Sequence, residues 1–265
     1  DGGGLVIREW NTLEMRNFPL VRTAAGQVIW SPDSRTLAYQ SSDFKLMKVA
    51  LDGSPPLAIG DLPNVGGGAW SEDGVILVGV RRGGLQRIPA SGGTLSPATT
   101  LAKGQTEHLF PQFIGGGRFL FQATGDKAAS GIYVASLTDP NGKVVLPIAD
   151  ADRNSLNFSY VPPLGGGDAY ILYTSQNVLL AQAVDPSSLE LKGSASTIAQ
   201  DVENISASRT GTLVYNPGVE CFDAFHHAPV IGSHVVQELL RTDVGSVTIY
   251  DNLTRGKATN VADAL

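Results

Sequence analysis

Four side chains near the end of the sequence are of the types that bind zinc. They are Cys221, His226, His227 and His234. Thiolate and imidazole groups are the usual zinc ligands, but this spacing matches none of the common structural zinc sites. We interpret the group as incidental and predict no metal site. Because Cys221 is the single cysteine, the chain has no internal disulfide.

A second set of side chains could line a calcium site, because carboxylates are the ligands that calcium prefers. The set comprises Asp33, Glu72, Asp73 and Asp126. These residues fall beside serine, proline and glycine, where Asp commonly accepts a hydrogen bond from its own backbone two residues on. We interpret them as turn residues. The sequence also lacks a Gly-x-Ser-x-Gly motif, and we predict no catalytic residue.

The elements that hold these residues follow a repeat, whose clearest copy is Trp30-Ser-Pro-Asp-Ser-Arg-Thr-Leu-Ala-Tyr39. An aromatic residue ends one short strand, and Pro32 and Asp33 favour a turn. The next strand places Leu37 and Tyr39 on one face. Related stretches begin at Trp70, Phe113, Val161 and Ser206.

The copies recur in steps of about 40 to 48 residues, which is typical of one four-stranded propeller blade per repeat. The sequence therefore predicts an all-β fold, a β-propeller of four-stranded blades over residues 1–218. Full blades are expected at about 22–62, 63–104, 105–150 and 151–200, with half-blades at 5–21 and 201–216. The half-blades either complete a fifth blade, which would hide their edges, or end an open arc.

Two further patterns are assigned structural rather than ligand-binding roles. Trp30, Trp70, Phe113 and Tyr173, one per repeat, are expected to pack between blades rather than to form a ring for ligand stacking. Glycine triplets at 2–4, 66–68, 115–117 and 165–167 are interpreted as turns and linkers, because none precedes Lys-Ser or Lys-Thr.

The net charge and the lengths of the apolar runs limit the kinds of partner that this chain could bind. The net charge of −6 over 265 residues argues against a nucleic-acid surface, which needs clustered Lys and Arg. The pair Arg81-Arg82 is expected in a solvated hairpin. No apolar run is long enough for a membrane span. The first residues, Asp-Gly-Gly-Gly-Leu, lack both Met and a signal segment, so we expect a fragment of a longer chain.

The repeats resemble TolB-like, WD-repeat-like bacterial β-propellers over about residues 5–216. The resemblance rests on Trp-Ser-Pro-Asp-Ser-Arg, on Lys-Leu-Met-Lys-Val-Ala-Leu-Asp-Gly, on Gly-Gly-Ala-Trp-Ser-Glu-Asp-Gly and on Phe-Pro-Gln-Phe. More narrowly, they are similar to the C-terminal propellers of bacterial membrane serine/threonine kinases. The resemblance implies a scaffold for protein or small-ligand binding outside the cytoplasm, without catalysis of its own.

From Val219 the period changes. Gly232 opens a stretch of helical spacing to Arg241, and 246–250 is expected to be a strand. The pattern of residues 219–265 therefore predicts a short α/β appendage of the βαβ type, which is a different fold class from the propeller.

This segment resembles the N-terminal Rossmann unit of NAD-dependent nucleotide-sugar epimerases and dehydratases. The resemblance implies cofactor binding by Gly232, Asp251 and Asn252, with NAD as the cofactor. However, His226 and Pro229 replace the first two glycines of the motif. The segment is interpreted as a fused or misjoined fragment. We therefore expect no cofactor unless this segment is functional.

The sequence as a whole predicts a non-enzymatic binding or sensor module for a protein or a small ligand, on the propeller face or in its channel. The alternative is a fragment of an NAD-dependent epimerase or dehydratase.

Overall fold

The structure is a computed structural model that describes residues 5–8, 15–18, 23–62, 65–148, 157–163, 166–208, 212–217 and 248–249. The chain divides into two compact units, 1–149 and 150–265. Short strands joined by turns make up almost all of the described chain, with one 3-10 turn, η1 (Lys127–Ala129). The all-β prediction is confirmed for these residues.

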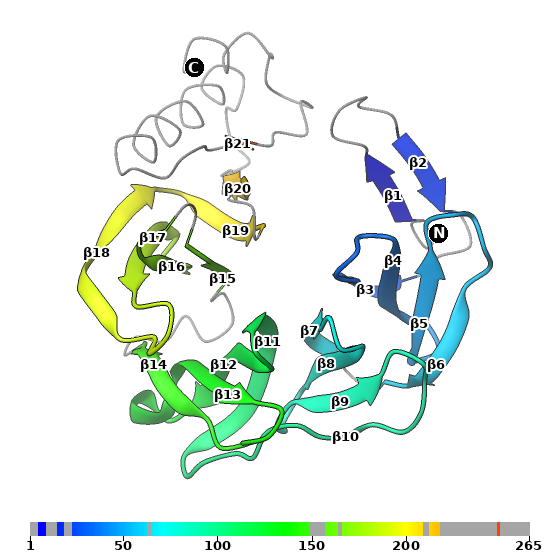
Figure 1. Ribbon diagram of the computed structural model, residues 1–265, viewed down its shortest axis with the longest axis horizontal. Helices are drawn as coiled ribbons and strands as arrows, with labels where there is room; N and C mark the ends of the chain where they lie inside the picture. Colours follow the sequence, from blue (N-terminus) through cyan, green and yellow to red (C-terminus); the bar gives the residue numbers. More distant parts are fainter. Residues whose placement is uncertain are drawn as a thin grey trace, which may run out of the picture. The chain divides into compact units, whose positions relative to one another are not determined.

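The first unit contains three four-stranded antiparallel sheets whose strands pair in chain order (Figure 1). The first sheet is formed by β3 (Thr23–Trp30), β4 (Thr36–Ser41), β5 (Lys45–Ala50) and β6 (Leu57–Asp61). The second is formed by β7 (Val65–Trp70), β8 (Val75–Val80), β9 (Gln86–Pro89) and β10 (Ser96–Pro97). The third is formed by β11 (Gln105–Gly115), β12 (Arg118–Gly125), β13 (Gly131–Ser136) and β14 (Lys143–Pro147). A two-stranded sheet of β1 (Leu5–Arg8) and β2 (Met15–Phe18) precedes them.

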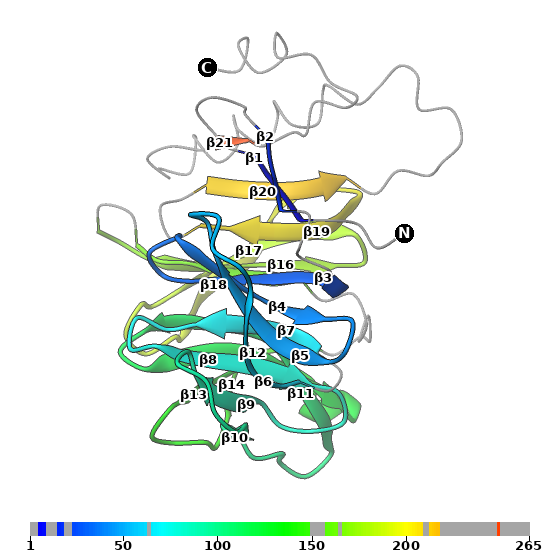
Figure 2. The same ribbon diagram turned by 90° about the vertical axis from the view of Figure 1, so that its right-hand side faces the viewer.

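The second unit contains one further four-stranded antiparallel sheet, of β15 (Phe158–Val161), β16 (Ala169–Ser175), β17 (Val178–Val184) and β18 (Leu191–Ala199). A second sheet pairs β19 (Val202–Ala207) with β20 (Thr212–Pro217), drawn as neighbouring antiparallel arrows in Figure 2. The short strand β21 (Thr248–Ile249) pairs with β20 in parallel. Each four-stranded sheet lies inside one of the ranges assigned to full blades.

Apolar side chains from neighbouring sheets form the core of the first unit. Between the first and second sheets lie Ile29, Ala38, Leu46, Ile59, Leu62, Ile76, Val78 and Ile88. Between the second and third lie Leu77, Leu85, Ala98, Phe119, Phe121, Ala123, Tyr133 and Ala135. The first strands of the three sheets are also neighbours, because β7 contacts both β3 and β11. The sheets therefore pack face to face, as successive blades of a propeller do.

The turn at the centre of the repeat has the structure that its sequence predicts. Asp33 Oδ1 accepts a hydrogen bond from the backbone N–H of Arg35 at 3.1 Å and another from Ser31 Oγ at 2.6 Å. Ser31 Oγ in turn accepts from the N–H of Thr36 at 2.9 Å. In the next repeat, Ser71 Oγ accepts from the N–H of Val75 at 3.0 Å. The serine therefore anchors the turn in both copies.

Two assignments from the sequence need correction. Gly66–Gly68 do not form a linker but lie within β7, which touches the first strands of both neighbouring sheets. Glycines suit this position because neighbouring backbones approach closely. The aromatic row of Trp30, Trp70 and Phe113 lies on the first strand of each sheet, whereas Tyr173 lies on the second strand, β16, and pairs with Phe158. Val161, which pairs with Tyr170, holds the equivalent position in the fourth sheet.

The other members of the aromatic row differ in their exposure. Trp70 packs against the core between the first and second sheets, and Phe113 packs against the core between the second and third. Trp30, at the same register position in β3, is 45% exposed. Packing between sheets is thus found for Trp70 and Phe113.

Most of the C-terminal segment lies outside the described residues. This applies to Gly232, Asp251 and Asn252, to the cysteine and histidine group, and to the expected helix of the Rossmann-like appendage. Only Thr248–Ile249 are described there, as a strand. NAD binding, the boundary near residue 218 and closure by the half-blades all stay predictions.

Candidate functional site

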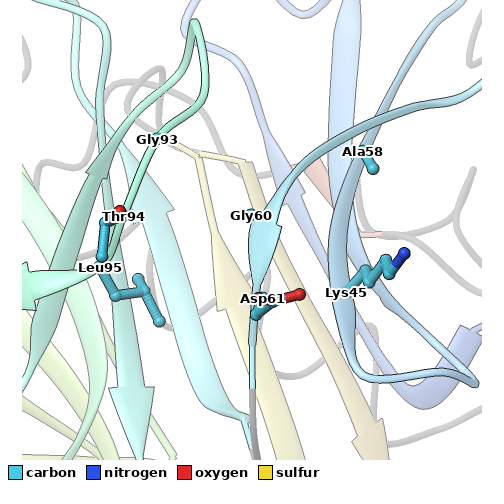
Figure 3. A pocket seen from close by; sticks show the side chains of 7 residues that line it. All are labelled: Lys45, Ala58, Gly60, Asp61, Gly93, Thr94 and Leu95. Carbon is cyan, nitrogen blue, oxygen red and sulfur yellow. The ribbon is translucent and has the colours of Figure 1, made fainter.

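A crevice of about 410 Å³ opens between the outer strands of the first sheet and the connection from β9 to β10. Its lining residues are Lys45, Ala58, Gly60, Asp61, Gly93, Thr94 and Leu95. Figure 3 shows Gly93, Thr94 and Leu95 on one side of Gly60 and Asp61 of β6, with Lys45 of β5 on the other side; Ala58 also belongs to β6. The crevice therefore follows the outer edge of β6, which is the last strand of its sheet.

A bulge in β6 sets the inner end of the crevice. The register between β5 and β6 shifts between Leu46 and Met47, leaving Ile59 as the extra residue. The carbonyl of Ile59 accepts a hydrogen bond from the N–H of Gly93 at 2.9 Å. Because bulges interrupt the pairing edge of a strand, the second sheet docks on β6 at this residue, and Asp61, two residues further on, is exposed.

Glycine makes that close docking possible. A Cβ placed on Gly60 would lie 2.5 Å from Cδ1 of Ile88 and 3.1 Å from the carbonyl oxygen of Gly93. Any larger residue at position 60 would push the connection away from β6. The shape of the crevice therefore depends on a backbone approach that only glycine allows.

The register also decides which backbone groups face the crevice. Leu62 N–H donates to the carbonyl of Phe44 at 2.7 Å, and Lys45 is paired with Asp61. In an antiparallel ladder, hydrogen-bonded and non-hydrogen-bonded pairs alternate, so Lys45 and Asp61 form a non-hydrogen-bonded pair. Consistent with this, Lys45 N–H points back to Ser41 Oγ, at 3.1 Å. The N–H and C=O of Asp61 therefore point away from β5, toward the open edge.

The side chains around this edge are polar and weakly engaged. The Asp61 carboxylate and the Thr94 hydroxyl are exposed and form no hydrogen bond or ion pair within the described residues. Lys45 Nζ lies 3.9 Å from Asp43 Oδ2, at the limit of an ion pair. Lys48 Nζ of β5 donates to the carbonyl of Ala90, the residue after β9, at 2.9 Å, which links the first sheet to the second. The edge of β6 keeps donor and acceptor groups that this link does not use.

A second polar group, centred on His108, lies between the second and third sheets. The His108 side chain is buried, with Nδ1 2.7 Å from Thr99 Oγ1 and Nε2 2.9 Å from Gln105 Oε1. Both partners also accept backbone hydrogen bonds, from Leu85 N–H to Thr99 Oγ1 and from Ala102 N–H to Gln105 Oε1. Since an amide oxygen only accepts, Nε2 carries the ring proton and Nδ1 accepts from the Thr99 hydroxyl.

Burial lowers the pKa of His108 from 6.5 to about 4. The ring of Phe121, 4.5 Å away between centroids, is one of the apolar surfaces that surround it. On the same strand, Glu107 accepts a hydrogen bond from Arg82 N–H at 3.1 Å and lies 3.7 Å from Arg81 Nη1. Neutral His108 has a partner at each nitrogen, which is the arrangement of a structural link rather than of a proton-transfer site.

The described residues contain no group of three or more His, Cys, Asp or Glu side chains placed to hold a metal ion. Within the described chain, no helix is long and apolar enough to cross a membrane. Of the candidate calcium ligands, Asp33 is committed to its turn. The sequence marks neither the crevice nor His108, because the crevice is built by backbone edges from two repeats and His108 belongs to no motif.

Comparisons with solved structures identify the fold. A putative TolB from Agrobacterium tumefaciens matches with a TM-score of 0.55 and 17% identity, over 79% of this chain and 76% of that one. The calcium-binding protein regucalcin from A. tumefaciens matches with a TM-score of 0.52 and 17% identity, over 70% and 64%. An oligogalacturonate lyase from Vibrio parahaemolyticus matches with a TM-score of 0.50 and 12% identity, over 78% and 61%. No family model and no curated protein matches the sequence.

The fold is thus a TolB-like β-propeller, as the sequence predicts. The chain spans less than two thirds of the regucalcin structure. Because the matching propellers include a lyase as well as TolB proteins, the fold by itself leaves the activity open.

Proposed function

We propose that this chain is a non-enzymatic binding module that captures its ligand in the crevice between β6 and the connection from β9 to β10. The observation that carries the proposal is the set of uncommitted polar groups around an open strand edge. The Asp61 backbone and carboxylate, together with the Thr94 hydroxyl, line the same crevice. Ligand sites commonly combine a concave surface with a few convergent polar groups.

The polar network of His108 supports a binding role over catalysis. An acid or base catalyst needs a nitrogen or oxygen within reach of a substrate, whereas both ring nitrogens of His108 contact protein groups. Its low pKa follows from burial and holds the ring neutral near pH 7. The crevice itself offers Lys45, Asp61 and Thr94, which can bind and orient a ligand.

A variant that fills the crevice tests the proposal. Thr94→Trp places a large ring in the opening at an exposed position, so the fold should be unaffected. Thermal shifts would be measured against a panel of small polar metabolites and against peptides selected from a random eight-residue display library. We expect at least one class of probe to raise the Tm of the wild-type chain, and Thr94→Trp to lose that shift.

Thr197→Trp is the matched control, because Thr197 is also exposed but lies on β18 of the second unit. It should keep the full shift. The proposal is wrong if neither class stabilises the wild-type chain, or if the shifts survive in Thr94→Trp.

The alternative function, a fragment of an NAD-dependent epimerase or dehydratase, rests on Gly232, Asp251 and Asn252, which lie outside the described residues. No described residue favours it. Adding NAD to the same thermal-shift panel tests it directly. A role as the sensor arm of a kinase is implied by the family resemblance alone and likewise stays a prediction.

A further inference from the structure

We infer that the ligand of this crevice is an extended peptide segment of a partner protein, which adds to β6 as a further strand at Asp61. The inference rests on the proposed function and specifies its ligand. An exposed strand edge offers backbone N–H and C=O groups in a row, and the chemical complement of such an edge is another extended backbone.

The position of the added strand follows from what already covers β6. Gly93 N–H donates a hydrogen bond to the carbonyl of Ile59, so an added peptide cannot pair with Ile59. Beyond this contact, the N–H and C=O of Asp61 point to the open side, and Gly60 bonds toward β5. The peptide therefore exchanges its first pair of backbone hydrogen bonds with Asp61.

The charges at the edge specify a preferred side chain on the peptide. Lys45 lies opposite Asp61 on β5, but its ammonium group lies beside Asp43, and in Figure 3 it points away from the Asp61 carboxylate. The carboxylate is left without a cationic partner among the described residues. Since opposite charges directly across a ladder attract, a Lys or Arg of the peptide opposite Asp61 is favoured.

The wall formed by Gly93, Thr94 and Leu95 limits the peptide to a short contact. Thr94 is exposed and Leu95 is partly buried against the core between the first and second sheets. A peptide lying on β6 would place alternate side chains toward this wall, where the hydroxyl of Thr94 and the isobutyl group of Leu95 are available. Backbone pairing thus supplies the binding mode, and this wall together with Asp61 supplies the sequence preference.

The test uses the eight-residue peptides selected on the wild-type chain. Each peptide is resynthesised with a single N-methyl group at each position in turn, which removes one backbone donor. Strand addition predicts that N-methylation of the peptide residue paired with Asp61 lowers the affinity by about tenfold or more, while methylation at the other positions lowers it less. It also predicts a basic residue in the selected peptides, and a several-fold loss of affinity in Asp61→Asn, which keeps the backbone N–H.

The outcomes separate the two proposals. If Thr94→Trp blocks the peptides but no single N-methylated position loses binding, or if Asp61→Asn binds as well as wild type, strand addition is wrong and the crevice remains a binding site. If the selected peptides bind equally to Thr94→Trp, both proposals are wrong. If the library yields no binder, the ligand is not a peptide, and the small-molecule arm of the panel decides the proposed function.

Discussion

The Nδ1 atom of His108 lies 2.7 Å from the Oγ1 atom of Thr99, and this contact joins β11 of the third sheet to the end of the second. Thr99 Oγ1 already accepts the N–H of Leu85, so its own proton is directed to the imidazole. Protonating Nδ1 would remove the acceptor of that hydroxyl and place a charge in an apolar interface beside Phe121. The two sheets are thus held by a link that requires neutral histidine.

This link makes the stability of the chain depend on pH. The pKa of His108 is about 4 in the folded chain and about 6.5 when unfolded. Between these values the unfolded chain binds more protons, so the free energy of unfolding falls as the pH is lowered from 6.5 to 4. The loss attributable to His108 reaches about 3 kcal/mol at most.

Urea denaturation at several pH values measures this loss, with His108→Gln as the comparison. The variant is expected to be less stable at pH 7 but to vary less between pH 4.5 and 6.5. The difference between the two slopes isolates His108 from every other titrating group. Aspartates with lowered pKa values, among them Asp33, Asp43, Asp52 and Asp185, act below this window. Equal slopes for the two proteins would refute the role given to His108.

The turn after Trp30 offers a second prediction. Asp33→Ala removes the acceptor for Ser31 Oγ and for Arg35 N–H, and we expect a lower urea midpoint of unfolding. Asp73 holds the aligned position in the next repeat but forms no side-chain hydrogen bond within the described residues. Asp73→Ala should therefore change the urea midpoint little. A similar loss in both variants would show that the side-chain bonds of Asp33 do not stabilise the turn.

A third prediction concerns the close packing of β7, β8 and β11. A Cβ on Gly79 would overlap the carbonyl oxygen of Gly66 and lie 3.1 Å from the Cα of Leu109. Because these are backbone atoms, they cannot move aside, and Gly79→Ala should lower the free energy of unfolding by about 1–3 kcal/mol. Gly83→Ala is the matched control, since the nearest atom to its Cβ is 3.9 Å away. Thermal or urea unfolding of the two variants measures the difference, and equal stabilities would contradict the packing described.

The sequence allowed the blades to be placed because each repeat carries its own local signals. Each four-stranded sheet lies inside an expected blade range, with Lys45–Ala50 a strand within 22–62 and Val178–Val184 a strand within 151–200. The Ser-Pro-Asp-Ser turn could likewise be predicted, because Asp33 bonds backbone within two residues. Gly66–Gly68 were misplaced because glycine favours turns locally, and only the neighbouring strands show why a glycine-rich strand is needed there.

The candidate site could not be predicted in the same way. Its floor is the backbone of β6, and its wall comes from the following repeat, tied by Gly93 to Ile59. The orientation of the Asp61 amide depends on a register that the bulge at Ile59 shifts. Such features have no side-chain motif. The role of His108 could not be predicted for a related reason. It depends on contacts with Thr99 and Gln105, and neither residue type indicates a histidine partner.

Amide hydrogen exchange at Asp61 tests the proposed binding mode most directly. The N–H of Asp61 faces the open edge, whereas the N–H of Leu62 is bonded to the carbonyl of Phe44. In the free chain, the Asp61 amide should therefore exchange quickly and the Leu62 amide slowly. Adding a selected peptide should slow exchange at Asp61 and leave Leu62 unchanged. If the peptide binds while exchange at Asp61 stays fast, β6 is not the strand to which the ligand adds.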